Sequence, residues 1–543
     1  MAKQSLLPQP DNPARLAALI LLVLAPFAVG LLALALGQDA NWDLRNYHWY
    51  NAYSFVNGRF GKDFLPSQTP WFYNPALDIP FYLLASHVSA RLAGFVLGFV
   101  QGFNFILLFM IAHATLVIEK PWRKFIVAAA LAALGLLGGG GIALIGTTFY
   151  DNVTSLGTFL SALLVITQYE RLTTGPWGRT FGLAVLVGLP AGLMMGLKLP
   201  CVIFCIGFCF SILFMGNRWR RQFVVSFGFG IGVLLGVAIT LGYWAHFLQT
   251  QFGNPLFPYF NDFFKSPLAP TTSARDIQFV PYGFWNVALF PFRFATIPYI
   301  VGEISWRDWR IPILYALVPL AVIARMAFGR IGSKDQLAVP ESSRYLLVAG
   351  TITYLLWLWM FAIYRYAIPL EMMAPLLIVL AVGLLPIRLK LRAVAAVLLL
   401  LVVTLSISPG NWTRRDHWLD RFVEASIPPI EPNGLMILMA GTDPYSHVLS
   451  EFPHQISFVR IQSNFSSPEE DKGINQLIAQ RVRRHRGNFM LLIPPYQLDQ
   501  AEKAMSFCGL KLAHRDEPCQ TVVDSLYGDT LLSHCSVVRN KQN

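Results

Sequence analysis

The densest run of polar residues in this sequence lies at positions 39–48, directly after the first apolar segment. Asp43 and Tyr47 are four residues apart in this run, a spacing that places both on one face of a helix. A carboxylate held against an apolar membrane surface resists ionisation, and its higher basicity suits general base catalysis. The alternative role for Asp43 is an N-cap that accepts backbone N–H bonds at a helix start. The two roles are compatible.

A second carboxylate, Asp151, stands in a short polar turn at positions 147–152 between two apolar segments. Two carboxylates from different loops on one face would suit acid–base or metal chemistry, and a helix cap is again the alternative. The chain has no His, Cys and Asp cluster with the spacing of a strong metal site. It also lacks the P-loop, G-x-S-x-G and H-E-x-x-H motifs. We therefore predict no resident metal or cofactor, while a divalent metal remains compatible with the two carboxylates.

Three cations are predicted to bind a phosphate: Lys198 in a tight link between apolar segments, Arg293 in a long loop, and Arg365 in the run Tyr364-Arg365-Tyr366. Cations at membrane depth are costly and usually have an anionic partner, for which lipid phosphates are the obvious candidates. The alternative is that each side chain only reaches out to the lipid headgroups.

The composition identifies the class of protein. Of 543 residues, 55% are hydrophobic and only 13% are charged, whereas ordinary globular chains are about 25% charged. The excess apolar residues must face lipid or fill a helical bundle. The net charge of +12 does not indicate nucleic-acid binding, because Lys and Arg lie mostly in short links between apolar runs.

The apolar segments predict about eleven membrane-spanning helices, since each span needs roughly 20 apolar residues. The predicted spans are 16–36, 92–118, 125–146, 152–169, 180–196, 199–216, 222–244, 311–327, 345–363, 367–386 and 393–408.

Every second link is basic, for example 120–124, 218–221 and the link with Arg325, Arg330 and Lys334. These links are therefore predicted to be cytoplasmic, as is the N-terminus. An odd number of spans then places the C-terminus outside.

We predict a transmembrane module at 1–410, with two long outer loops at 37–91 and 245–310, and a soluble α/β domain at 411–543. Loops of this length are usually functional. In the domain, residues 434–440 and 488–493 resemble buried strands and residues 474–486 an amphipathic helix. A disulfide is permitted outside the cytoplasm. We expect Cys519 to pair with Cys535, because both flank strand-like runs, which leaves Cys508 unpaired.

Two further patterns are best explained by packing. Gly138–Gly141, four glycines inside an apolar span, indicate close helix packing rather than phosphate binding. Cys201, Cys205 and Cys209 share a helix face without any His or acidic residue nearby, so we interpret them as packing residues rather than a metal or redox site.

The order and sidedness of several short motifs resemble the GT-C superfamily of membrane glycosyltransferases over roughly residues 1–410. The matching residues are Asp43, Tyr47, Ala52 and Gly58 in the first loop; Asn74-Pro75-Ala76-Leu77, where many members carry Lys-Pro-Pro-Leu; Tyr150-Asp151 as the second-loop acid; Gly196-Leu197-Lys198; Arg365-Tyr366 with Pro369; and Gly253-Asn254-Pro255-Leu256-Phe257-Pro258. Asn74 departs from the family lysine, so the phosphate would need another cation such as Lys198 or Arg293.

The resemblance implies an all-α polytopic fold and a bacterial inner-membrane enzyme with its C-terminal domain in the periplasm. It implies a polyprenyl-phosphate sugar donor and a glycan, lipid or protein acceptor. Asp43 would deprotonate the acceptor hydroxyl, and displacement from the opposite side would invert the anomeric centre. Asp151 would assist as the second catalytic acid, while Tyr47, His48, Asn74 and Asp78 are expected to bind substrate.

Two other classes of function remain open. A lipid-linked glycan flippase or transporter would place its charges near the bilayer midplane and often show internal repeats. No repeat is evident, and most ionisable residues lie at the ends of spans. An O-antigen polymerase or ligase would also have many spans and a large outer loop. The acid directly after the first span favours the transferase.

Overall fold

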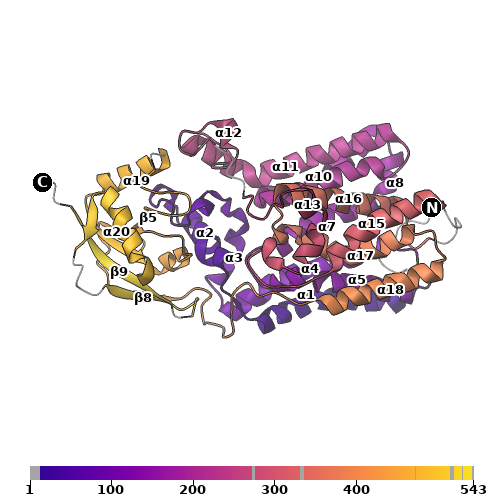
Figure 1. Cartoon of the computed structure of the whole chain (residues 1–543), viewed down its shortest axis with the longest axis horizontal. Helices are drawn as coiled ribbons and strands as arrows, with labels where there is room; N and C mark the ends of the chain where they lie inside the picture. Colours follow the sequence, from indigo (N-terminus) through magenta and orange to yellow (C-terminus); the bar gives the residue numbers. More distant parts are fainter. Residues whose placement is uncertain are drawn as a thin grey trace.

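The computed structural model describes residues 13–271, 276–329, 336–470, 473–513, 519–528 and 530–540. Figure 1 shows an elongated molecule with a helical bundle at one end and a sheet-containing domain at the other. Helices α2 (Trp49–Val56) and α3 (Ile79–Ala85) lie between these two parts. The predicted fold class, a polytopic helical bundle with a small C-terminal α/β domain, is confirmed. Arg330 and Lys334, used above to assign sidedness, lie outside the described residues.

Seven helical stretches in the described residues are long and apolar enough to cross a membrane. They are α1 (Pro13–Leu36), α4 (Ala90–Thr115), α9 (Trp177–Leu197), α11 (Trp219–Phe252), α15 (Arg310–Phe328), the continuous η8 (Tyr364–Ala367) and α17 (Ile368–Leu384), and α18 (Leu389–Ser406). The other four predicted spans also coincide with helices, namely α5 (Pro121–Leu136), α7 (Asp151–Thr167), α10 (Val202–Ser211) and α16 (Pro340–Met360). The multi-pass bundle is thus confirmed, while the count of eleven spans stays a prediction.

Helix α17 forms the centre of the bundle. Every side chain from Ile368 to Val382 is buried, and α17 contacts α5, α7, α15, α16 and α18. By contrast, α18 lies at the rim and buries only Arg392, Ala396 and Val403. Because η8 leads directly into α17, the central helix holds Arg365 at the end of the bundle that the C-terminal domain covers.

Short helices complete the bundle and the two long loops. In the bundle these are α6 (Gly139–Ala143), α8 (Tyr169–Thr174), η5 (Leu199–Cys201) and η6 (Ile212–Phe214). The first loop, between α1 and α4, contains β1 (Gln38–Asp39), η1 (Leu44–His48), α2, η2 (Arg59–Gly61), η3 (Thr69–Phe72), η4 (Pro75–Leu77) and α3. The second loop, between α11 and α15, contains α12 (Asn261–Phe264), α13 (Phe284–Ala288), α14 (Phe290–Phe294) and η7 (Pro298–Ile300).

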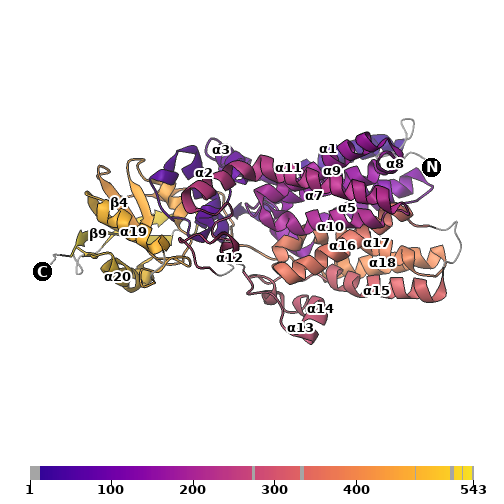
Figure 2. The ribbon, with the colours of Figure 1, turned by 90° about the horizontal axis from the view of Figure 1, so that it is seen from above.

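Helix α11 continues past its predicted end at 244, as far as Phe252. The extension is stabilised by aromatic packing: the Phe252 ring lies 5.0 Å from Phe72 and 4.9 Å from Phe257, centroid to centroid. The second loop therefore begins later than the sequence indicates. Figure 2 shows its α13 and α14 projecting from the side of the bundle.

The C-terminal domain is built on a seven-stranded mixed sheet. The strand order is β3-β8-β9-β6-β4-β5, with β7 also paired to β9. The strands are β3 (Ala425–Ser426), β4 (Leu435–Met439), β5 (Ser457–Arg460), β6 (Asn488–Ile493), β7 (Leu510–Leu512), β8 (Gln520–Asp524) and β9 (Thr530–Arg539). Strands β5, β4 and β6 are parallel, and the other pairs are antiparallel. Its helices are η9 (Ser446–Glu451), α19 (Gly473–Arg484), η10 (Pro495–Gln497) and α20 (Leu498–Phe507).

Several local predictions for this domain are confirmed. The predicted strands are β4 and β6, and the predicted amphipathic helix is α19. Cys519 and Cys535 form the expected disulfide, while Cys508 is a buried free thiol. The pairing follows from the register, because Gln520 of β8 lies opposite His534 of β9 and so brings the preceding and following residues together.

The domain holds the first loop in place. Strand β1 pairs with β2 (Arg414–Arg415) in an antiparallel ribbon. Phe64 extends the sheet beside β5, since its N–H donates to the Phe458 carbonyl at 2.9 Å and its carbonyl accepts from Arg460 at 3.0 Å. Buried Asp63 accepts from the Phe458 N–H at 2.9 Å. The loop that carries Asp43 is therefore clamped between bundle and domain.

A buried histidine in the C-terminal domain indicates that acid destabilises the folded domain. Neither ring nitrogen of His534 has a hydrogen-bond partner among the described residues, and burial lowers its pKa from 6.5 to about 4. As the pH falls below 6.5, the unfolded chain binds this proton before the folded domain does, so stability present at neutral pH is lost down to about pH 4. We expect the free energy of unfolding to fall by on the order of 3 kcal/mol over this pH range. Calorimetric unfolding at pH 7.0, 6.0, 5.0 and 4.5 would measure it.

The matched variants are His534→Leu, which should flatten the pH dependence, and His417→Leu at an exposed position, which should leave it unchanged. Equal pH dependence in wild type and His534→Leu would show that another group is responsible.

Candidate functional site

Asp43 forms an ion pair instead of a helix cap. It precedes η1 with helical backbone angles, and its side chain makes no capping hydrogen bond. Its Oδ2 accepts from the Tyr47 hydroxyl at 3.1 Å and from Nη1 of Arg365 at 3.2 Å. The four-residue spacing thus produces the predicted shared face. Oδ1 has no hydrogen-bond partner among the described residues, and 15% of the side chain remains exposed. That oxygen is available to accept a proton.

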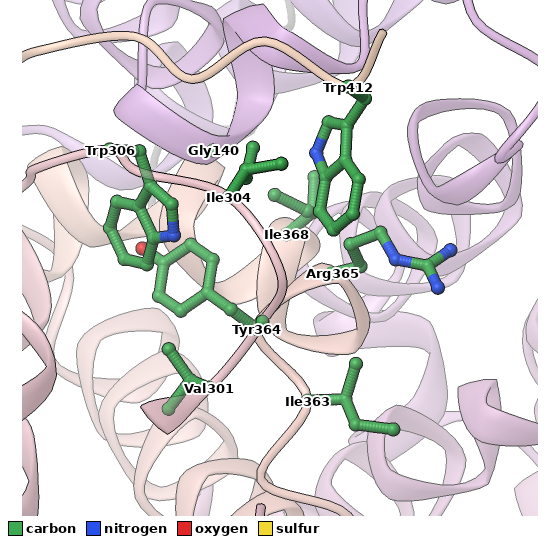
Figure 3. Close-up of a pocket in the computed structure, with 10 residues that line it drawn as sticks. Gly140, Val301, Ile304, Trp306, Ile363, Tyr364, Arg365, Ile368 and Trp412 are labelled. Carbon is green, nitrogen blue, oxygen red and sulfur yellow. The ribbon is translucent and has the colours of Figure 1, made fainter. Parts of the chain in front are cut away.

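Arg365 is held by aromatic rings. Its guanidinium carbon lies 4.1 Å from the ring centroid of Phe149 and 5.1 Å from that of Trp412. Figure 3 shows the guanidinium pointing away from Tyr364 and Trp306. The pocket beside Tyr364 and Trp306 has a volume of only about 10 Å³, which is room for about one water molecule. The charged group of Arg365 is therefore directed to Asp43.

Lys198 and Asp151 form the second ion pair. Nζ of Lys198 lies 2.7 Å from Oδ1 of Asp151 and donates to the Phe149 carbonyl, also at 2.7 Å. The Asp151 side chain makes no capping bond, and Tyr150 occupies the cap position of α7. Oδ2 of Asp151 is buried without a hydrogen-bond partner among the described residues. Lys198 and Arg365 meet at one turn, because both contact Phe149.

His48 and Asp78 form a third pair, with Nδ1 and Oδ1 separated by 2.6 Å. Burial, with the positive charges of Lys198 and Arg365, holds the pKa of His48 well below 6.5. Burial also raises the pKa of the Asp78 carboxyl well above 3.8. Both shifts disfavour the charged forms of the two side chains. Nε2 of His48 is buried and unpartnered among the described residues, so a ligand oxygen would satisfy it.

Tyrosine rings connect these groups. The His48 ring lies 4.1 Å from Tyr47 and 5.0 Å from Tyr150, and Tyr47 lies 5.4 Å from Tyr73. The hydroxyls of Tyr73 and Tyr259 are 2.7 Å apart, which joins the first loop to the second. Tyr47 and His48 were expected at the site from the sequence, and Tyr150 has a sequence signal in its place before Asp151. No short-range pattern identifies Tyr73, Tyr259 or Trp412.

Arg293 is not brought to this site. It is exposed in the projecting α13–α14 segment, where its guanidinium donates to Asn286. The prediction that Arg293 joins Lys198 and Arg365 is therefore not met in this structure. The physical reason is that the segment leaves the bundle before it could approach Asp43.

Asn74 has a structural role. Its Nδ2 donates to the carbonyls of Gly196 at 3.0 Å and Thr240 at 2.9 Å, and its Oδ1 accepts from the Ala76 N–H at 3.1 Å. Both polar atoms of the amide are thus used to tie the first loop to α9 and α11. Asn74 fixes the end of α9, and with it Lys198, rather than presenting a group to substrate.

The glycine run at 138–141 binds the carboxylate of one buried glutamate, and we call this contact the clamp. The N–H groups of Gly140 and Gly141 donate to Glu371 of α17 at 3.2 and 2.7 Å. A Cβ at Gly138 would overlap the Glu371 carboxylate, and one at Gly140 would overlap the Tyr364 ring. The close-packing interpretation is therefore borne out by the contacts to Glu371 and Tyr364. The clamp fixes the start of α17 and so the position of Arg365.

We predict that Gly138→Ala destabilises the protein by about 1–3 kcal/mol, the usual cost of overpacking, and lowers any activity that depends on Arg365. The control is Gly182→Ala in α9, where an added Cβ meets no atom within 4 Å. That change should be neutral or stabilising by up to about 1 kcal/mol. Melting temperatures of the two variants in the same detergent would decide between them. A Gly138→Ala protein as stable as Gly182→Ala would contradict the clamp.

Among the described residues, no three His, Cys, Asp or Glu side chains gather as metal ligands would. The prediction that no metal is required remains a prediction.

Comparisons with known proteins give two similar structures. No protein-family model matches the chain, and no curated protein sequence matches it. The cryo-EM structure of arabinofuranosyltransferase AftD from Mycobacteria aligns with 96% of this chain at 13% identity and a TM-score of 0.49, and the chain spans 40% of its length. The crystal structure of ArnT from Cupriavidus metallidurans bound to undecaprenyl phosphate aligns with 96% of this chain and 98% of its own, at 12% identity and a TM-score of 0.38.

The first of these is an arabinofuranosyltransferase by name. Both structural similarities are too low for residue roles to be transferred to this chain. The geometry of the three pairs must therefore support any functional assignment.

Proposed function

We propose that this protein transfers a sugar from a polyprenyl-phosphate donor to an acceptor hydroxyl at the membrane surface, with inversion of the anomeric centre. One observation carries the proposal. Separate segments of the chain bring two partly exposed cations, two carboxylates and a hydrogen-bonded His–Asp pair to one end of a membrane-type bundle; these are Lys198, Arg365, Asp43, Asp151, His48 and Asp78.

The cations suit the leaving group. Displacement at the anomeric carbon breaks its bond to the phosphate oxygen, so negative charge grows on the lipid phosphate. Lys198 and Arg365 are 16% and 15% exposed, and both contact the turn at Phe149. A phosphate placed between them would receive charge-assisted hydrogen bonds from both side chains.

An apolar groove offers a place for the lipid tail. It lies between α4, α7 and α9, has a volume of about 430 Å³, and is lined by Phe103, Ile106, Leu107, Leu156, Gly157, Leu160, Pro190, Leu193 and Met194. Leu193 and Met194 precede Lys198 by about one helical turn, and Leu156 follows Asp151 by a similar distance. A prenyl chain in this groove would therefore hold its phosphate near Lys198.

Asp43 is positioned as the general base. Its Oδ1 is unpartnered among the described residues, while Oδ2 is fixed by Tyr47 and Arg365. In the reaction Oδ1 takes the acceptor proton as the acceptor oxygen attacks the anomeric carbon opposite the phosphate. A donor phosphate that draws Arg365 toward itself would weaken its hold on Asp43. Nε2 of His48, which lacks a partner, would hydrogen-bond a sugar oxygen.

The placement of charge disfavours a transporter. Asp43 lies beyond the end of α1, Asp151 is the first residue of α7, and Lys198 directly follows α9. A transporter would be expected to hold its charges near the bilayer midplane. Groups at helix ends instead suit chemistry at the headgroup level.

Turnover by the purified protein tests the proposal. The protein in lipid nanodiscs is given radiolabelled polyprenyl-phosphate sugars and an envelope-glycan extract, and release of free polyprenyl phosphate is measured with the anomeric configuration of the product. The proposal expects release and inversion. Movement of intact lipid-linked sugar across a vesicle without cleavage would establish the transporter alternative instead.

A further inference from the structure

The C-terminal domain presents a polar and aromatic cluster at one edge of its sheet. Parallel strands β4 and β6 end at Met439 and Ile493, and the chain after β4 crosses to β5 on the far side of β4 from β6. The segments after β4 and β6 therefore leave in different directions. In open α/β sheets this position, outside the carboxyl ends of the strands, is where ligands bind.

Four residues from four segments meet there, and we call them the edge cluster: Arg45 of η1, Asp443 after β4, Tyr496 after β6 and Tyr527 in the β8–β9 turn. The Tyr496 hydroxyl donates to Asp443. The Arg45 guanidinium carbon lies 3.6 Å from the Tyr527 ring centroid. Arg45 also lies within electrostatic range of Asp443.

The two tyrosines are unusually open. Tyr496 is 76% exposed and Tyr527 is 42% exposed, whereas Arg45 beneath them is 7% exposed. The hydrogen bond to Asp443 raises the pKa of Tyr496 to about 12, so its hydroxyl keeps its proton and its ring stays neutral. The result is two exposed aromatic faces beside one carboxylate, on a support fixed by a buried arginine.

We propose that the edge cluster binds a neutral oligosaccharide portion of the acceptor. A sugar ring offers an apolar face of C–H groups, which suits an aromatic ring, and hydroxyls that donate to a carboxylate. Arg45 and Asp443 carry opposite charges that cancel, which disfavours a phosphate or polyanion. This inference rests on the proposed function for the identity of the ligand as acceptor, and it selects a glycan over a lipid or protein.

The cluster and the proposed base meet at one short helix, because Asp43 directly precedes η1 and Arg45 lies within it. Arg45 and Asp43 are two residues apart at η1, and their side chains diverge: Asp43 contacts Arg365, while Arg45 lies over Tyr527. An oligosaccharide held at the edge cluster would need to extend only across η1 to bring a terminal hydroxyl to Asp43. The domain would then set which acceptor is used and leave the chemistry to the bundle.

Binding of full-length protein in nanodiscs to an array of bacterial envelope oligosaccharides tests the cluster directly. We expect wild type to bind neutral oligosaccharides, and the double variant Tyr496→Ala/Tyr527→Ala to bind them about tenfold or more weakly. Tyr527→Phe keeps the ring and should retain binding. Tyr282→Ala, at a tyrosine that is 92% exposed in the second loop, should bind like wild type.

The outcomes separate the two proposals. Binding that survives Asp43→Asn but fails in the double alanine variant supports the cluster, even if no turnover is found. Turnover by wild type with an unchanged acceptor KM in the double variant overturns the cluster and leaves the proposed function standing. Wild type that binds no neutral oligosaccharide, or only anionic ones, also overturns it.

Discussion

Asp43→Asn is expected to lower sugar transfer by roughly 10²- to 10⁴-fold, the usual contribution of a general base. The asparagine keeps the size of the side chain and can still accept from Tyr47 and Arg365, so the fold should survive. It has no lone pair basic enough to take the acceptor proton. The loss of charge beside Arg365 should cost about 1–2 kcal/mol of stability. Turnover of a radiolabelled polyprenyl-phosphate sugar, measured with melting temperature, gives both quantities.

The control for this variant is Asp416→Asn, at an exposed position directly after strand β2, which should retain full turnover. Donor binding should also persist in Asp43→Asn, because the proposed phosphate contacts are Lys198 and Arg365. Full activity in Asp43→Asn with an intact fold would remove the base assignment and leave Asp43 as a structural partner of Arg365.

Lys198→Met should reduce kcat/KM for the donor by about 10²-fold or more, because the positive charge beside the leaving phosphate is lost. It should also destabilise the protein by about 3–5 kcal/mol, since it leaves a buried carboxylate without its cation. Asp151 is only 5% exposed in this pair. Stability and activity thus fall together in the single variant, which alone would not separate the two roles.

The double variant Lys198→Met/Asp151→Asn separates them. Removal of both charges should restore most of the melting temperature, because no unpaired charge remains buried. Activity should stay low, because the cation is still missing. Arg293→Met is the matched control, since this cation lies outside the site and should leave the donor KM unchanged. Restored activity in the double variant would reduce Lys198 and Asp151 to a structural pair.

Local patterns predicted what depends on neighbours in sequence. The four-residue spacing of Asp43 and Tyr47 was sufficient to place them together, and the flanking strands were sufficient to pair Cys519 with Cys535. Strand β6 (Asn488–Ile493) occupies the predicted residues because a short, mostly buried apolar run has few other options.

Contacts between distant segments could not be predicted in this way. The sequence around Asp43 is equally compatible with a helix cap and with an ion pair. Only the approach of Arg365, 322 residues away, distinguishes the two roles. The positions of Asn74 and Arg293 could not be predicted for the same reason. A polar residue in a long loop has the same sequence pattern whether it ties helices together, projects outward or faces a substrate. The partner of the glycine run, Glu371, is 230 residues from Gly141.

The most direct test of the central claim is the cryo-EM density of the protein in nanodiscs with added polyprenyl phosphate. We expect a phosphate within hydrogen-bonding distance of Lys198 and Arg365, on the side that faces Oδ1 of Asp43, with the prenyl chain in the groove between α4, α7 and α9. A phosphate bound elsewhere on the bundle, with the Lys198–Asp151 and Arg365–Asp43 pairs undisturbed, would contradict it.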